Sequence, residues 1–215
     1  MNRFVLGIII VNVLMSMKGF NEYSFLDKYK FQVGKILSGE KVRMFTSGFL
    51  HVDWAHLVFN MYALYLFGGM VSGTLGDVNF LIIYFGSLML SNMYSLFYHK
   101  EETYYSAVGA SGAVSGILYS AILLYPNKVY NFIFFPFIDI PAYVLGVGYL
   151  LYSIYGMKKQ LGNIGHSAHL GGAIGGFSIT LLVFPRLISE HLLMVGLLAV
   201  PIVLLLLFGS KLKNL

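Results

Sequence analysis

The sequence predicts an all-α fold, a polytopic bundle of transmembrane helices, and composition is the first reason. Hydrophobic residues make up 58% of the 215-residue chain and charged residues only 11%, with a mean hydropathy of +0.76. A soluble domain carries about 25% charged residues. The second reason is that the apolar residues fall into seven stretches of helical length, separated by polar segments.

A helix that crosses a bilayer needs about 20 mainly apolar residues, and we expect one helix for each stretch. The first stretch is short and follows Arg3, as in a signal peptide. No small-residue cleavage site follows it, so we expect it to remain as a helix. In chain order the stretches are Phe4–Met17, His56–Val71, Val78–Tyr98, Ala107–Tyr125, Ile140–Met157, His166–Phe184 and His191–Phe208.

A polar segment, Lys18–Leu50, separates the first two spans. It mixes charged residues with Phe and Tyr, which indicates a structure lying in the membrane interface with its rings among the headgroups. No repeat or low-complexity segment divides the chain elsewhere. We therefore expect a single membrane domain over residues 1–215.

Charge and cysteine content exclude several classes of protein. The formal net charge of +5 comes from Lys and Arg in short loops, where they meet lipid headgroups, so we expect no nucleic-acid partner. The absence of cysteine excludes disulfides, thiolate metal sites and cysteine catalysis. We expect no metal and no cofactor, and the lipid bilayer is the first predicted partner.

Polar residues gather where the second, fourth and sixth spans begin. These spans run in the same direction, so their N-terminal ends lie on one membrane face, whereas the opposite ends hold no comparable group of His or Asn. Polar side chains inside a membrane are costly and mark functional sites, and a serine needs a nearby base to become a nucleophile. The pattern predicts a serine nucleophile with a histidine base. The gathered residues are His51, His56 and Asn60 at the second span, Ser111 at the fourth, and His166 and His169 at the sixth.

Small residues on two of these spans indicate that the spans touch. Small residues four apart let helix backbones approach closely in lipid. His169, Gly172 and Gly176 share one helical face, so packing of the two stripes brings Ser111 close to His169. Stripes of this kind also pack helices in transporters that perform no chemistry, so alone they leave function open. The stripes are Ser111, Gly112, Ser115 and Gly116 on the fourth span and Gly171, Gly172, Gly175 and Gly176 on the sixth.

His56 and Asn60 are four residues apart and face the same way on the second span. An Asn amide donates two hydrogen bonds, and a serine protease must stabilise the oxyanion of a tetrahedral intermediate. We expect His56, Asn60 and the backbone N–H of Ser111 to be the donors. The alternative is that Asn60 only ties helices together.

The chain resembles the rhomboid family of intramembrane serine proteases over nearly its whole length. Three motifs carry the resemblance. Gly109-Ala110-Ser111-Gly112 resembles the Gly-x-Ser-Gly nucleophile motif, His169 with Gly172 and Gly176 resembles the base histidine and its Gly-x-x-x-Gly helix, and His51, His56 and Asn60 resemble the family's two histidines and asparagine. Arg43 matches the arginine of the first-loop motif.

The resemblance implies an intramembrane serine endopeptidase that cleaves transmembrane segments of membrane proteins near the membrane surface. Ser111 and His169 then form a catalytic dyad. His56 and Asn60 serve the oxyanion, and His51 supports the site. It also implies a six-helix core over about residues 1–185, with an additional C-terminal helix at about 190–208.

The chain departs from the family pattern at Val42 and at Ser115. Val42 stands where Trp often precedes the arginine. Ser115 stands four residues after the serine, where many bacterial members carry an aromatic residue beneath the base histidine; Tyr119 lies one turn further, and what orients His169 is left open. Asp53 reads as the N-cap of the second span rather than as a third catalytic acid.

The family layout predicts a multi-pass protein of a bacterial cell membrane, with the site opening to the extracytoplasmic face. The positive-inside rule points the other way, because 11 of the 14 Lys and Arg residues lie on the face of the site. The loop Met157–Gly165 leads to His169, and we expect it to be a mobile cap over the site.

Two alternatives come from other classes. One is a catalytically silent rhomboid-like membrane protein that binds transmembrane clients, although such proteins lack the serine or the histidine. The other is a transporter or metal site built from the histidine cluster, against which stands the absence of a His-Glu-x-x-His motif. The residues available to that metal site are His51, Asp53, His56, His166 and His169.

Overall fold

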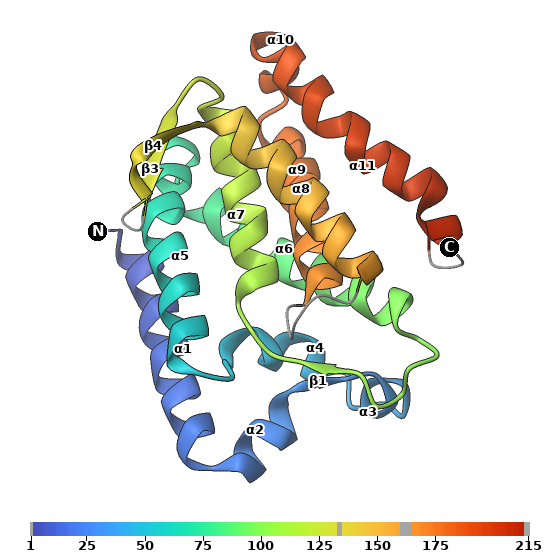
Figure 1. The fold of residues 1–215 in the computed structure, drawn as a ribbon. Helices are drawn as coiled ribbons and strands as arrows, with labels where there is room; N and C mark the ends of the chain where they lie inside the picture. The colour runs from blue at the N-terminus through green and yellow to red at the C-terminus, as the bar shows by residue number, and fades with distance from the viewer. Residues whose placement is uncertain (1, 133–134, 160–164, 213–215) are drawn as a thin grey trace.

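A computed structural model describes residues 2–132, 135–159 and 165–212, and these are mostly helical (Figure 1). Each of the seven apolar stretches coincides with a helix. Among the helices of the described residues, α1, α5 and α6 are long and apolar enough to cross a membrane. The seven helices are α1 (Arg3–Asn21), α5 (Trp54–Leu75), α6 (Asp77–Tyr98), α7 (Ser111–Leu124), α8 (Ala142–Lys159), α9 (His166–Val183) and α11 (Leu192–Leu212).

Local chemistry explains where several of these helices begin. The side chain of Asn2 accepts a hydrogen bond from Phe4 N, which caps α1. Asp53 Oδ1 accepts from His56 N at 2.7 Å and caps α5, as the sequence predicts. Gly76, with a φ of +80°, makes the tight turn between α5 and α6 that L side chains rarely adopt.

Helix α7 lies at the centre of the bundle, and every residue from 112 to 124 is buried. It is surrounded by α5, α6 and α9, and α9 packs mainly on α6 and α7. Helix α1 covers α5, while α8 lies against α9 and α11 lies outside α8 (Figure 1). The three central helices α6, α7 and α9 therefore form the core that positions the site.

The segment after α1 folds into short elements at the end of the bundle where α5, α7 and α9 begin (Figure 1). Strand β1 pairs antiparallel with β2 (Ser106–Ala107), which ties the segment to the loop before α7. Arg43 is buried and donates from Nη1 to the carbonyls of Asp27 and Lys30, at 2.6 and 3.0 Å. The elements are α2 (Tyr23–Tyr29), β1 (Phe31–Gln32), α3 (Val33–Leu37), α4 (Arg43–Thr46) and η1 (Ser47–Phe49).

A β-hairpin of strands β3 (Val129–Phe132) and β4 (Phe135–Pro141) lies at the opposite end, and the sequence did not predict it. Tyr130 of β3 packs edge-on against Phe67 of α5, with ring centroids 5.3 Å apart. A short helix, α10 (Leu187–Glu190), joins α9 to α11. The expected cap at Met157–Gly165 falls largely on residues 160–164, which lie outside the described residues.

Candidate active site

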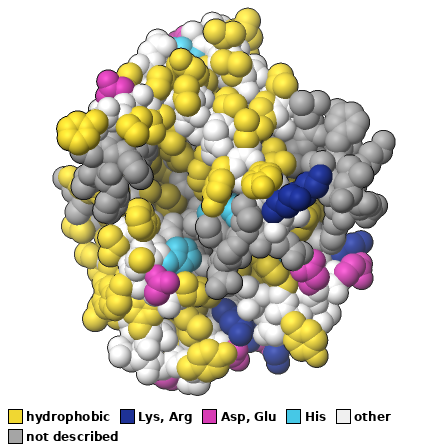
Figure 2. Space-filling model, in the orientation of Figure 1, with side chains coloured by type: hydrophobic (Ala, Val, Ile, Leu, Met, Phe, Trp, Pro, Cys, Tyr) yellow, Lys and Arg dark blue, Asp and Glu magenta, His cyan; other side chains and the backbone are white. Residues whose placement is uncertain are grey.

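The predicted polar residues meet at the end of the bundle where α5, α7 and α9 begin (Figure 1). Figure 2 shows histidine side chains near the middle of this face of the molecule, below a largely hydrophobic surface, and histidine also at the top; the visible Lys and Arg side chains lie to the right and in the lower part.

The loop before Ser111 brings it beside His56. Gly109 has a φ of +140°, and a Cβ atom built on it would lie 2.9 Å from His56 Nε2. Both the backbone conformation and the close approach therefore require glycine. The Cβ position built on Gly109 also lies 3.6 Å from Ser111 Oγ. The His56 ring and the serine hydroxyl therefore both lie beside Gly109.

His51 anchors this loop to the segment before α5. It is fully buried, and its Nε2 accepts a hydrogen bond from Ala110 N at 3.4 Å. The proton of the neutral ring therefore sits on Nδ1, which donates to Ser16 Oγ at 2.9 Å. Burial, reinforced by the nearby His56, lowers the pKa of His51 to about 3, so the ring stays neutral near pH 7. His51 thus holds the loop in place without a charge.

The predicted contact between the glycine stripes is observed. A Cβ atom on Gly172 would overlap the carbonyl oxygen of Gly112 and lie 2.9 Å from its Cα. Gly176 meets Gly116 in the same way one turn further along. The backbones of α7 and α9 therefore touch directly, and Ser111 and His169 stand at the adjoining ends of the two helices.

His169 is packed by an aromatic ring rather than by a carboxylate. The ring of Tyr149, from α8, stacks on the imidazole with centroids 5.7 Å apart and planes 22° apart. Within the described residues, His169 Nδ1 has no hydrogen-bond partner, and none links its ring to the hydroxyl of Ser111. Catalytic hydrogen bonds are often long before substrate binds, so the contact between the two residues stays a prediction.

Asn60 lies one turn after His56 and is 6% exposed. Its Nδ2 donates to the carbonyl of His56 at 2.9 Å, which leaves a second N–H on the same amide. The His56 ring packs edge-on against His51 at 4.9 Å. His56 is thus held beside the loop that carries Ser111, and Asn60 is bonded to the backbone of His56 one turn further along α5.

His166 belongs to the contact between α8 and α9. A Cβ atom on Gly156 would lie 2.6 Å from His166 Nδ1, and Tyr152 packs edge-on against the same ring at 5.3 Å. Across the described part of the chain, no three His, Cys, Asp or Glu side chains gather closely enough to hold a metal ion. The metal-site alternative therefore has no ligand set among these residues.

A serine–histidine–carboxylate cluster lies outside the predicted site, and sequence reasoning missed it. His99 Nδ1 bonds Glu102 Oε2 at 2.9 Å, and His99 Nε2 bonds Ser167 Oγ at 3.2 Å. Ser167 is 1% exposed and also bonds Ser95 Oγ at 3.1 Å, so a peptide carbonyl has no path to its hydroxyl. The cluster fastens the start of α9 to the end of α6.

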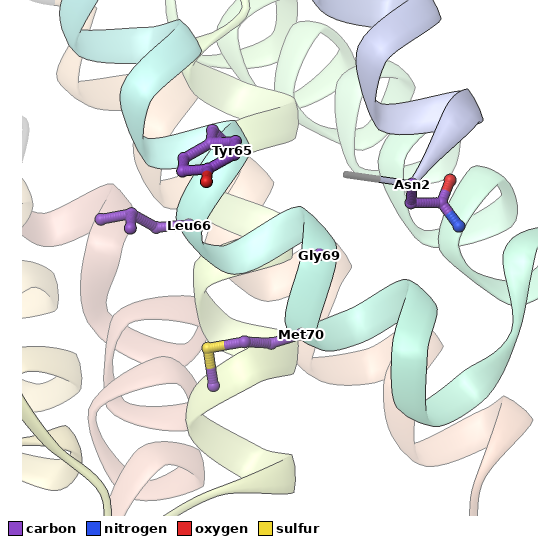
Figure 3. A pocket seen from close by; sticks show the side chains of 5 residues that line it. All are labelled: Asn2, Tyr65, Leu66, Gly69 and Met70. Carbon is purple, nitrogen blue, oxygen red and sulfur yellow. The ribbon is translucent and has the colours of Figure 1, made fainter.

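A separate hollow between α1 and α5 contains no comparable chemistry (Figure 3). Its lining holds no histidine, carboxylate or serine, and Gly69 contributes only backbone. Of the two places, only the histidine-lined end therefore offers a nucleophile beside candidate bases. The lining residues are Asn2, Tyr65, Leu66, Gly69 and Met70.

Comparison with known proteins places residues 38–186 in the Rhomboid domain. The chain is similar to RHOMBOID-like protein 12, mitochondrial, of Arabidopsis thaliana, at 30% identity over 79% of this chain and 55% of that protein. It is 31% identical to Rhomboid protein 1, mitochondrial, of Saccharomyces cerevisiae, over 72% of this chain and 45% of that protein. It is 34% identical to Rhomboid protease GluP of Bacillus subtilis, over 66% of this chain and 26% of that protein. The chain thus spans about half the length of these relatives or less.

Proposed function

Because the chain belongs to the rhomboid family, whose domain implies a polytopic helical membrane fold, we propose that it is an intramembrane serine endopeptidase. The observation that carries the proposal is the backbone contact of Gly112 with Gly172, which sets the start of α7 beside the start of α9. Ser111 is the proposed nucleophile and His169 the proposed base.

The proposed reaction follows from the donors and acceptors around Ser111. His169 takes the hydroxyl proton while Ser111 Oγ attacks a peptide carbonyl, and it then gives that proton to the leaving amine. The free N–H of Asn60, the His56 ring and the Ser111 backbone N–H donate to the oxyanion. Water, deprotonated by His169, then attacks the acyl carbon, and His169 returns the proton to Ser111 Oγ as the acid leaves. His51 supports the loop, and Gly109 admits the close approach of His56.

The proposed substrates are transmembrane segments of other membrane proteins, cleaved near the membrane surface. Backbone groups are costly to expose in hydrocarbon, so a substrate helix must unwind at the membrane edge before its carbonyl reaches Ser111. The site lies at the ends of α5, α7 and α9, which suits that depth. In this proposal α1, α5, α6, α7, α8 and α9 form the six-helix core, and α11 is the additional C-terminal helix.

Incubation of the purified protein with a transmembrane test substrate, beside the Ser111→Ala variant, tests the proposal. Cleavage by the wild type alone supports it. Stable binding of the substrate with no cleavage by either form would instead favour the catalytically silent relative considered above.

We expect Asn60→Ala to lower kcat by about 10–10³-fold with a smaller change in KM, because one oxyanion donor is lost. Initial rates over a range of substrate concentrations separate the two constants. Asn79→Ala is the matched control, since Asn79 makes the same bond to the carbonyl four residues earlier, near the start of α6 at the opposite end. An unchanged kcat in Asn60→Ala would reduce this residue to a structural role.

We also propose that the site face lies outside the cytoplasm, against the distribution of Lys and Arg. In intact bacterial cells expressing the protein, a C-terminal tag is then expected to be reached by an impermeant label, because α11 ends on the side where α9 begins. Labelling of a cytoplasmic control protein must stay absent. A tag reached only after cell lysis would reverse the orientation.

A further inference from the structure

The ring of Tyr149 lies nearly parallel to the His169 imidazole in an offset stack, with centroids 5.7 Å apart and planes 22° apart. Tyr149 comes from α8, whereas His169 begins the second turn of α9. The contact therefore joins two different helices through side chains alone. Aromatic rings prefer offset stacks with centroids about 4.5–7 Å apart, so the contact favours this orientation of the imidazole.

The position of the Tyr149 ring is itself fixed from α7. Its hydroxyl lies 2.5 Å from Ser115 Oγ, and Ser115 Oγ donates to the carbonyl oxygen of Ser111 at 2.7 Å. Two successive hydrogen bonds thus connect the ring that touches His169 to the backbone of the proposed nucleophile. This connection links α8 to α7, as the glycine contact links α9 to α7.

Other groups near His169 do not supply that restraint. Its Nδ1 accepts or donates no hydrogen bond within the described residues, so no polar partner orients the ring there. The ring of His166 meets it only edge-on, at 6.2 Å. Tyr119 is directed elsewhere, because its hydroxyl donates to the carbonyl of Gly146. Of the two ring contacts of His169 among the described residues, the one with Tyr149 is nearly parallel and the one with His166 is edge-on.

We propose that Tyr149 is a positioning residue that orients His169 toward Ser111, with Ser115 holding the Tyr149 ring at the right depth. The proposal rests on the proposed function. It assigns to α8 a task that the sequence left open, since Ser115 itself has no ring to place beneath the histidine.

The test compares Tyr149→Met, which removes the ring, with Tyr149→Phe, which keeps the ring and removes the hydroxyl. We expect kcat to fall by about 10–100-fold in Tyr149→Met with KM within about twofold, because misplacement of a catalytic group by about 1 Å has effects of this size. Tyr149→Phe keeps the ring but loses its bond to Ser115, so we expect an intermediate loss in kcat of about 3–10-fold. Tyr149→Leu replaces Tyr149→Met if the latter does not fold.

Tyr152→Leu is the matched control. Tyr152 also lies on α8 and packs against a histidine, but that histidine is His166. Its kcat is expected to stay within about threefold of the wild type, since the orientation of His169 is untouched. An equal loss of kcat in Tyr152→Leu, or an unchanged kcat in Tyr149→Met, overturns the positioning role of Tyr149. Cleavage by the wild type would still support the proposed function.

A second measurement does not depend on activity. With ring-labelled histidine, the His169 Cε1–H resonance, identified by its loss in His169→Ala, is expected to move in Tyr149→Met and to move less in Tyr149→Phe. This result supports the contact between Tyr149 and His169 even if the wild type cleaves no substrate. In that case the proposed protease function is wrong, but the contact between the two rings stands. A His169 resonance that is unmoved in Tyr149→Met overturns the proposal.

Discussion

Ser111→Ala and His169→Ala are each expected to abolish cleavage of a transmembrane substrate while the protein still folds. Alanine at position 111 provides no nucleophile. Without His169 as the base, the Ser111 hydroxyl keeps its proton. Because the two residues act as a unit, the double variant is expected to be no worse than either single one, with each loss on the order of 10⁴–10⁶. Rates of substrate cleavage and thermal unfolding of each variant provide the measurements.

Ser167→Ala is the matched control for the nucleophile, because Ser167 bonds His99, which in turn bonds the carboxylate of Glu102. A serine-directed phosphonate is expected to label the wild type and Ser167→Ala but not Ser111→Ala. Labelling lost in Ser167→Ala and kept in Ser111→Ala would show that the wrong serine is assigned.

Gly172→Ala is expected to destabilise the protein and to abolish activity, although it adds one methyl group. In an ordinary helix, alanine in place of glycine stabilises by about 1 kcal/mol. Here the methyl group would overlap the carbonyl of Gly112, so α7 and α9 must separate. Overpacking of this kind costs about 1–3 kcal/mol, and separation also moves Ser111 away from His169.

The control for this variant is Gly73→Ala. Gly73 lies within α5, and nothing lies within 4 Å of a Cβ atom built on it. Helix propensity changes equally in the two variants, so a difference in melting temperature reports the contact alone. Equal melting temperatures and equal activities in both variants would contradict the importance of the glycine contact.

Much of this fold follows from local pattern, because each helix carries its own signal. Apolar length fixes the helices, Asp53 marks the start of α5, and the spacing of Gly172 and Gly176 marks the face that touches α7. The direction of alternate spans then places His56, Ser111 and His169 at one end without any knowledge of loops. These inferences need only the periodicity of a helix and the thickness of a bilayer.

Contacts between distant side chains were beyond such reasoning. The stack of Tyr149 on His169 joins helices whose mutual rotation no local pattern encodes. The bond of His99 to Ser167 depends on where the loop after α6 folds back. The β3–β4 hairpin also escaped prediction, because its apolar residues continue the hydropathy of the neighbouring spans. The first two of these features depend on contacts between segments that are distant in the sequence.

The direct contact of α7 with α9 has a consequence for how the protein is made. Ribosomes deliver the chain from its N-terminus, so Ser111 reaches the membrane before the segment that carries His169 has been synthesised. Until α9 inserts and its glycines dock on Gly112 and Gly116, the proposed nucleophile has no base. In the proposed mechanism the nascent chain therefore cannot cleave other proteins until α9 is in place.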